Sequence, residues 1–237
     1  MANGNEPQRE PMFNLPPAIA VFVFLSLAIF VGQTYYLTGD ARMSFVETFC
    51  FSPLRYPLLV SGVTVAGGWF AAIWTPFTYI FINPRLSNLV FDMFWLMAFG
   101  SAVAFRLGSV RFVVFSLVAA VVGAGLFSLI AGGDANILFG PSFVVGAHLG
   151  AAVRFLYARE FSDLVSVHAR WDGPALGLIE MWSNVKVLQL FGFIFAANAL
   201  FSLLYASNGV DIRDIILNTL AYFVGMLLLS IFDRKVK

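Results

Sequence analysis

The chain has 237 residues, of which 60% are hydrophobic and 11% are charged. A soluble domain of this length could not bury so much apolar surface, so the composition predicts a polytopic membrane protein. The net charge of +1 gives no indication of nucleic-acid binding. A single cysteine, Cys50, excludes an internal disulfide, and we expect it to be a small packing residue.

The first 15 residues form a polar segment in which Arg9 lies between Glu6 and Glu10. This segment lacks the short apolar core and the small-residue cleavage site of a secretory signal. We therefore expect the first helix to remain as a membrane anchor and residues 16–237 to form one transmembrane domain.

Six apolar runs are each long enough to cross a bilayer, which takes about 20 residues. They lie near Pro16–Tyr36, Asn88–Phe105, Phe112–Ile130, Phe139–Tyr157, Val187–Tyr205 and Ile215–Phe232. The sequence thus predicts an all-α bundle of six transmembrane helices, and an even number of crossings places both termini on one side.

Most of the 14 Lys and Arg residues fall on the side of the termini. That group is Arg9, Arg106, Arg111, Arg154, Arg159, Arg170, Lys186, Arg234, Lys235 and Lys237, against Arg42, Arg55, Arg85 and Arg213 on the other side. Cytoplasmic segments of membrane proteins are enriched in Lys and Arg, so this asymmetry predicts cytoplasmic termini.

Two connections are long. Leu37–Ser87 is too apolar for a disordered linker, and we expect a folded hairpin at the membrane interface with Trp69 and Trp74 as aromatic anchors. Residues 158–184 carry mixed charges with Trp171 and Trp182, which predicts an amphipathic piece on the membrane surface.

Polar residues interrupt three of the predicted spans. Asn88 and Asp92 are four residues apart and share one helix face, while Ser142 and Asn218 begin the fourth and sixth spans. Polar groups in hydrocarbon are costly and usually face other helices. We expect these four residues to share one buried cluster near the outer leaflet.

Small residues follow two of these polar positions at helical spacing. Gly146 and Gly150 follow Ser142, and Ala221 and Gly225 follow Asn218. Such stripes let neighbouring backbones approach closely, so we expect them to be helix-packing residues that enclose the fourth helix.

Ser142 has no obvious base. A serine becomes a nucleophile only with a base in hydrogen-bond reach. His148 is six residues along the same helix, roughly 9 Å away along the axis and about 240° around it. His168 and the lysines fall in or beside charged segments on the opposite side of the membrane. This inventory argues against a serine hydrolase, and Ser142 reads as a small residue at a helix start.

Several short stretches carry a further pattern. They are Trp74–Tyr79 with Phe81, Asn88–Met93, Phe99-Gly100 with Arg106-Leu107-Gly108, Gly140-Pro141-Ser142-Phe143, and Asn218-x-x-Ala221-x-x-x-Gly225. In these stretches the chain resembles the rhomboid superfamily of intramembrane serine proteases. The resemblance implies that Ser142 stands at the nucleophile position, Asn218 at that of the histidine base, and Asn88 and Asp92 where the family holds the oxyanion.

The chain departs from the family pattern around Ser142. The amide of Asn218 cannot accept a proton near neutral pH, and an ionised Asp92 would repel an oxyanion. Pro141 removes a backbone donor, and Phe143 replaces a glycine. Loss of one triad member costs orders of magnitude in rate, so we expect a catalytically inactive pseudoprotease in which Ser142, Asn88, Asp92 and Asn218 are relic positions.

The resemblance implies a rhomboid-like protein that binds transmembrane helices of other proteins, as a subunit or assembly factor of a larger membrane complex. The alternative is an intramembrane serine protease with unusual chemistry, in which Asp92 acts as the base to Ser142. A transporter or channel is a third class, but no span shows the repeated charges expected there. Membrane lipids are the other expected partners.

His148 and Asp92 each have a second interpretation. His148 lies in the middle of the fourth span and could bind a tetrapyrrole as a single axial ligand, but we favour a hydrogen-bonded packing histidine and expect no cofactor or metal. Asp92 could relay protons, but we favour a carboxylic acid paired with Asn88 or Ser142.

The ends of the chain indicate its source. Arg9-Glu10-Pro11, Leu15-Pro16-Pro17 and the closing Phe232-Asp233 look like rhomboids of alphaproteobacteria. That likeness implies a bacterial inner membrane, with the mitochondrial inner membrane as the alternative.

Overall fold

A computed structural model describes residues 15–56, 67–131, 136–158, 173–205 and 212–233. The first 14 residues of the predicted polar segment lie outside the described residues. So do His168 and Trp171, together with the basic residues Arg9, Arg159, Arg170, Arg234, Lys235 and Lys237.

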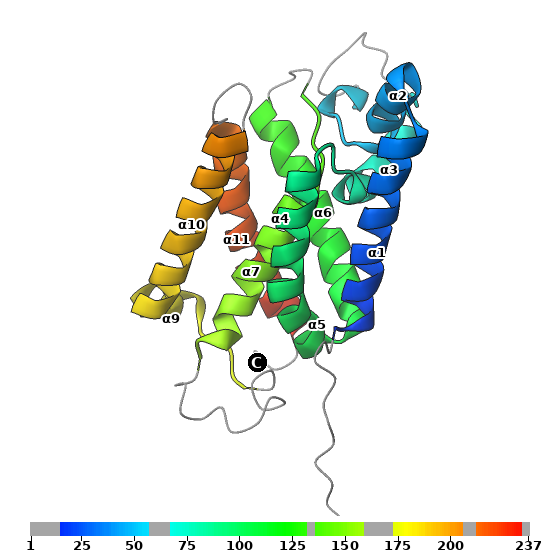
Figure 1. The fold of residues 1–237 in the computed structure, drawn as a ribbon. Coiled ribbons are helices and arrows are strands. Elements are labelled where there is room, and N and C mark those ends of the chain that lie inside the picture. The colour runs from blue at the N-terminus through cyan, green and yellow to red at the C-terminus, as the bar shows by residue number, and fades with distance from the viewer. Residues whose placement is uncertain (1–14, 57–66, 132–135, 159–172, 206–211, 234–237) are drawn as a thin grey trace, which may run out of the picture.

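The described residues are mainly helical, and the long helices run side by side in one bundle (Figure 1). In chain order the elements are α1 (Pro17–Val31), η1 (Gly32–Tyr36), α2 (Gly39–Phe49), η2 (Pro53–Arg55), α3 (Ala71–Thr78), η3 (Tyr79–Phe81), α4 (Leu86–Trp95), η4 (Leu96–Gly100), α5 (Ser101–Leu107), α6 (Ser109–Ala131), α7 (Ser142–Leu156), α9 (Leu178–Ser183), α10 (Val185–Tyr205) and α11 (Ile212–Phe232). The elements η1 and η4 are π-helical turns, and η2 and η3 are 3₁₀ turns.

Within the described residues, 4 helical stretches are long and apolar enough to cross a membrane. They are Pro17–Tyr36, Leu86–Leu107, Ser109–Ala131 and Arg213–Phe232, and two shorter apolar stretches are Ser142–Leu156 and Val185–Leu200. A helix of 20 residues is about 30 Å long, which matches the bilayer core. The chain is therefore a helical membrane bundle, and each predicted apolar run coincides with one of these stretches.

The fourth run begins later than predicted. The prediction placed its start at Phe139, but α7 begins at Ser142 because Gly140 has a φ of +80° and Pro141 follows it. The helix has 15 residues, about 22 Å, which is shorter than the bilayer core of about 30 Å. Every residue from Phe143 to Phe155 is buried, so α7 is the enclosed helix.

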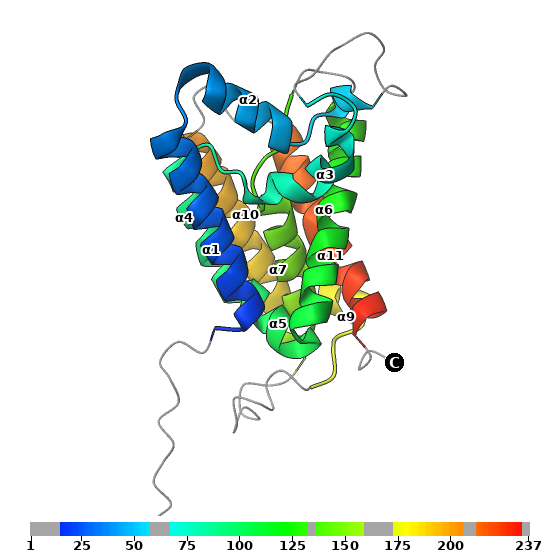
Figure 2. The same ribbon diagram turned by 90° about the vertical axis from the view of Figure 1, so that its right-hand side faces the viewer.

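The segment before α7 descends into the bundle from the end that carries α2 (Figures 1 and 2). Backbone groups at this depth need partners because lipid offers none. Leu138 and Phe51 exchange two backbone hydrogen bonds of 2.8 and 3.1 Å, and the Gly140 N–H donates to the Tyr79 carbonyl at 2.9 Å. These contacts hold the start of α7 inside the protein.

The long connection after α1 folds as a hairpin. Figure 2 shows α2 lying across one end of the bundle and α3 between α1 and α6. The two arms are joined by hydrogen bonds from Trp74 Nε1 to the Thr48 carbonyl at 3.2 Å and from Thr78 Oγ1 to the Phe49 carbonyl at 2.7 Å. Trp74 is therefore tied within the hairpin, whereas Trp69 is 63% exposed, as an interfacial anchor would be.

At the opposite end, two buried arginines tie the helices together. Arg106 of α5 forms a 2.6 Å salt bridge with Asp233 and donates to the Gly173 carbonyl at 2.8 Å. Arg154 of α7 donates to Ser230 Oγ of α11 at 2.6 Å. Removing one partner from such a buried pair leaves an uncompensated charge, so this network fixes α5, α7 and α11 at the end where α1 begins and α11 ends.

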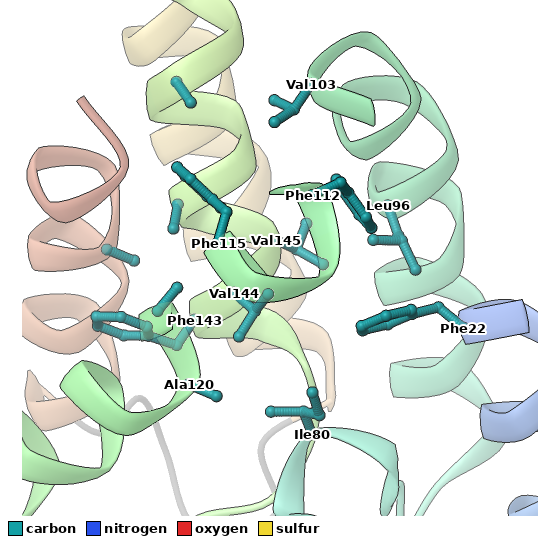
Figure 3. Packing of buried hydrophobic residues seen from close by; sticks show 14 of the residues in the cluster. Phe22, Ile80, Leu96, Val103, Phe112, Phe115, Ala120, Phe143, Val144 and Val145 are labelled. Carbon is teal, nitrogen blue, oxygen red and sulfur yellow. The ribbon is translucent and has the colours of Figure 1, made fainter. Parts of the chain in front are cut away.

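The apolar core lies around α6 and α7 (Figure 3). Phe112 and Phe115 of α6 and Phe143 of α7 are at most 2% exposed. Phe143 lies directly against Gly123 of α6, so a ring fills the space beside the start of α7.

Candidate functional site

A cavity of about 180 Å³ lies at the start of α7, between α4 on one side and α10 and α11 on the other. Its polar lining residues are Asn88, Asp92, Ser142, Asn198, Asp214 and Asn218. A smaller cavity of about 30 Å³ shares Asp92, Ser142, Asn198 and Asn218 with it. The structure thus brings together the four polar residues singled out in the sequence and adds two more.

The central contact of this site joins Ser142 to Asp92. The Ser142 hydroxyl donates a 2.9 Å hydrogen bond to Asp92 Oδ1. Asp92 is 4% exposed, while Ser142 is exposed toward the cavity. The two meet because α4 packs on α7. A carboxylate at this distance lies within the reach required of a general base, and it equally forms a stable hydrogen-bonded pair.

Asn218 lines the cavity from α11 but makes no hydrogen bond with Ser142. One turn later, the Tyr222 hydroxyl accepts a 3.3 Å hydrogen bond from Asn198 Nδ2 of α10. No histidine, lysine or arginine is among the described residues that line either cavity. The described part of the chain also contains no group of three His, Cys, Asp or Glu residues that could hold a metal ion.

The two small-residue stripes face each other and set the position of Asn218 relative to Ser142. A Cβ on Gly146 would lie 2.8 Å from the Cβ of Ala221. A Cβ on Gly150 would overlap the backbone of Tyr222, and one on Gly225 would overlap the backbone of Ala147. The backbones of α7 and α11 are therefore in direct contact, as small-xxx-small patterns allow.

His148 lies on another face of α7, away from the cavity. It is fully buried, with Nε2 2.9 Å from Ser116 Oγ. The Ser116 hydroxyl also lies 2.8 Å from the Phe112 carbonyl, so the imidazole, the hydroxyl and this carbonyl form one buried hydrogen-bonded group between α6 and α7. The ring stacks on Phe112 and Phe115 at centroid distances of 4.7 and 5.6 Å. One ring nitrogen is thus hydrogen-bonded and both neighbouring rings stack on the imidazole, while Nδ1 has no hydrogen-bond partner among the described residues.

Sequence reasoning missed four residues at or beside the site. Asp214 lines the cavity and directly precedes the sixth predicted run, so a charge at the edge of an apolar run was the available signal. Asn198 is a strongly polar residue in the middle of an apolar run, and that signal could have identified it. Trp95 lines the smaller cavity and had no distinguishing signal. Asn83, fully buried beside Gly140, precedes Pro84 and reads in sequence as an ordinary turn residue.

Comparison with known proteins addresses the family of the chain. A family model described as Rhomboid domain matches residues 71–228, which extend from α3 to the last third of α11. A search of curated proteins finds no match. Because the matched segment covers more than half of the chain and includes every helix around the cavity, the chain belongs to the rhomboid family.

Proposed function

We propose that this chain is a non-catalytic rhomboid-like protein that binds transmembrane segments of other proteins, as a subunit or assembly factor of a larger membrane complex. The observation that carries the proposal is the hydrogen bond from Ser142 to Asp92 in a cavity whose described lining contains no imidazole or amine. The polar lining of this cavity supports contact with a partner, while the groups that would activate a serine differ from the family pattern.

Three features around Ser142 support the absence of proteolysis. Asn218 occupies the position of the base with an amide, which does not take up a proton near neutral pH. Asp92 places a carboxylate where developing negative charge would have to be stabilised. Phe143, which replaces a glycine, is 2% exposed and packed against Gly123, so its ring fills the space beside the serine.

The surroundings of the cavity support helix binding. In the described part of the chain, α10 stands at one side of the bundle (Figure 1), where Phe191 packs on Tyr222 of α11 with ring centroids 5.6 Å apart. Phe94 of α4 and Phe193 of α10 are exposed, so both helices that supply lining residues to the cavity also carry apolar rings on their outer surface. A transmembrane segment laid between these helices would bury apolar rings and meet the polar groups of the cavity, and packing with interhelical hydrogen bonds drives helix association in membranes.

Two experiments test this proposal. Affinity purification from native membranes after gentle solubilisation should recover the chain with a larger assembly, and Ser142→Ala should leave that association intact. A photo-crosslinking residue at Phe94 or Phe193 should capture a partner, whereas one at Val110 on α6 should capture none. A monomer without partners at native expression levels would overturn the proposal.

The second candidate is an intramembrane serine protease in which Asp92 acts as the base. The 2.9 Å distance between Ser142 Oγ and Asp92 Oδ1 favours it, since a general base must lie within about 2.6–3.2 Å of the proton it removes. This candidate requires labelling of Ser142 by a serine-directed fluorophosphonate and loss of that labelling in Asp92→Asn. Our proposal requires no labelling in either protein.

For the topology we propose six crossings with both termini in the cytoplasm of a bacterial inner membrane, the mitochondrial inner membrane being the alternative. The helix α10 has 21 residues, enough to cross the bilayer core, and α7 with 15 residues is enclosed by the longer helices, which lets it begin inside the bilayer. The Lys and Arg asymmetry supports the orientation. Reporter fusions after residue 56 and after residue 233 should report opposite sides of the membrane, and the same side for both would contradict it.

A further inference from the structure

We propose that the cavity at Ser142 recognises a basic side chain, lysine or arginine, carried within the membrane-spanning part of the partner. This inference rests on the proposed function and names the chemistry that the partner must present. It is argued from the sign of the charge in the cavity, from a buried amide without a partner, and from the aromatic rings beside Asp92.

The charge of the cavity is acidic. Asp92 lines it with a buried carboxyl group, and the described lining has no lysine, arginine or histidine. The remaining polar groups are the amides of Asn88, Asn198 and Asn218 and the hydroxyl of Ser142, all of which carry an oxygen acceptor. A carboxyl group inside a membrane protein usually pairs with an opposite charge. A lysine ammonium has three donors and no acceptor, so it matches this lining, whereas an acidic side chain would meet like charge.

Asn83 provides an independent observation. It is fully buried, and neither atom of its amide has a hydrogen-bond partner among the described residues. Its Oδ1 lies 3.2 Å, and Asp92 Oδ2 lies 3.4 Å, from the point where a Cβ on Gly140 would be. Gly140 itself lines the cavity. Two oxygen acceptors thus converge beside a missing side chain, and a donor group entering there from the cavity would serve both.

Aromatic rings flank the same carboxyl group. Phe91, Trp95 and Phe99 line the smaller cavity together with Asp92. Trp95 makes an edge contact with Phe91 at 6.0 Å and stacks on Phe99 at 5.5 Å between centroids. Aromatic faces attract cations, and tryptophan does so most strongly. A carboxylate bordered by these rings favours a cation over a neutral polar group.

The cavity is large enough for the end of a long side chain. Its volume is about 180 Å³, whereas a single water needs roughly 10–15 Å³ by the same measure. Lysine and arginine also reach sideways from a helix with a flexible apolar stem. A partner helix lying against α4 and α10 could therefore extend its charge to Asp92 without unfolding.

The test uses the full chain in lipid nanodiscs and single-span peptides of leucine and alanine. The peptides differ only at one central position, which holds lysine, glutamine, leucine or glutamate, and their affinities are measured by fluorescence energy transfer. The lysine peptide should bind about tenfold or more tightly than the leucine peptide, as a buried charge-assisted contact implies. The glutamate peptide should bind most weakly.

Variants place the effect at Asp92. Asp92→Asn, nearly isosteric, should bring the affinities for the lysine and leucine peptides to within about twofold of each other, whereas Asp40→Asn on the exposed surface of α2 should keep the tenfold preference for lysine. Equal affinities for the four peptides on the wild-type chain would overturn this inference and leave the proposed function standing. If no peptide bound at all, the proposed function itself would fail. The four peptide affinities on the wild-type chain test the inference even if Asp92→Asn does not fold.

Discussion

The contact between α7 and α11 makes a quantitative prediction about glycine substitutions. A methyl group at Gly225 would lie 2.7 Å from the Cα of Ala147 and closer still to its carbonyl oxygen. Carbon atoms in contact are normally about 3.5–4.0 Å apart, and the carbonyl oxygen of Ala147 would be nearer to the methyl group than the Cα is, so the two helices would have to separate by more than about 1 Å. Overpacking a well-packed core costs roughly 1–3 kcal/mol, occasionally more. Because backbone atoms cannot rotate aside as a side chain can, we expect Gly225→Ala to lower the free energy of unfolding by about 3 kcal/mol.

The structure offers a graded set of controls for this prediction. Gly150→Ala also meets backbone, that of Tyr222, and should cost as much as Gly225→Ala. Gly146→Ala meets chiefly the Cβ of Ala221 and the ring of Tyr222, so its cost should be intermediate. A Cβ on Gly125 of α6 or Gly192 of α10 would meet nothing within 4 Å, and alanine there should stabilise the helix by up to about 1 kcal/mol.

Free energies of unfolding can be measured for all five variants by SDS titration in mixed micelles with tryptophan fluorescence. The order should be Gly225 and Gly150 as the most costly, then Gly146, with Gly125 and Gly192 neutral or stabilising. Wild-type stability in both Gly225→Ala and Gly150→Ala would refute the backbone contact between α7 and α11, and with it the placement of Asn218 opposite Ser142.

Three further predictions concern other parts of the molecule. Asp233→Asn should lower the free energy of unfolding by about 3–5 kcal/mol, because it leaves Arg106 buried without its charge partner; a cost no greater than that of Asp40→Asn would contradict this. Burial raises the pKa of the Cys50 thiol from 9.0 to about 12, which lowers its thiolate fraction about a thousandfold below pH 9. At pH 8, maleimide should therefore react with Cys50 much more slowly in folded protein than in SDS-unfolded protein. Above pH 9 the reaction rate of the folded protein should still rise, while that of the unfolded protein levels off. Equal reaction rates at pH 8 would refute the burial of Cys50. Finally, the purified protein should show no Soret-type absorption, since phenylalanine rings stack on His148; a band that His148→Ala removes would disprove this expectation.

Most of the fold could be predicted from hydropathy. The six apolar runs coincide with helical stretches because, in a bilayer, apolar length and satisfied backbone bonds decide where helices form. The shift of the fourth helix start from Phe139 to Ser142 has a physical reason. Phe139 is apolar and extends the run, but the glycine conformation at Gly140 and the ring of Pro141 decide where regular helix begins. The π-helical turn Leu96–Gly100 also has no signature in hydropathy.

The polar site could be predicted only in part. Asparagine, aspartate and serine inside apolar runs indicate that these residues face one another, and Asn88, Asp92, Ser142 and Asn218 do line one cavity. Which of them pair depends on how far α4 and α7 are shifted along each other. Spacing within one helix cannot give that shift, so the sequence left both Asn88 and Ser142 as partners of Asp92. Asn83 was missed because its burial depends on a loop that tertiary contacts fold inward.

The scaffold and the chemistry of this rhomboid domain rest on different residues. The position of α7 depends on backbone contacts at Gly150 and Gly225 and on the arginine network at the opposite end, none of which requires an imidazole at position 218. The amide of Asn218 therefore leaves the fold intact. Asp92 is different, because a buried carboxyl group is costly in a membrane, and an asparagine there could accept the same hydrogen bond from Ser142 without a charge. The fold therefore does not require the cost of burying the Asp92 carboxyl group, and a positively charged group of a partner would offset that cost. The affinity for a lysine-bearing helix is the measurement that distinguishes a cavity that binds a partner from one that has lost its function.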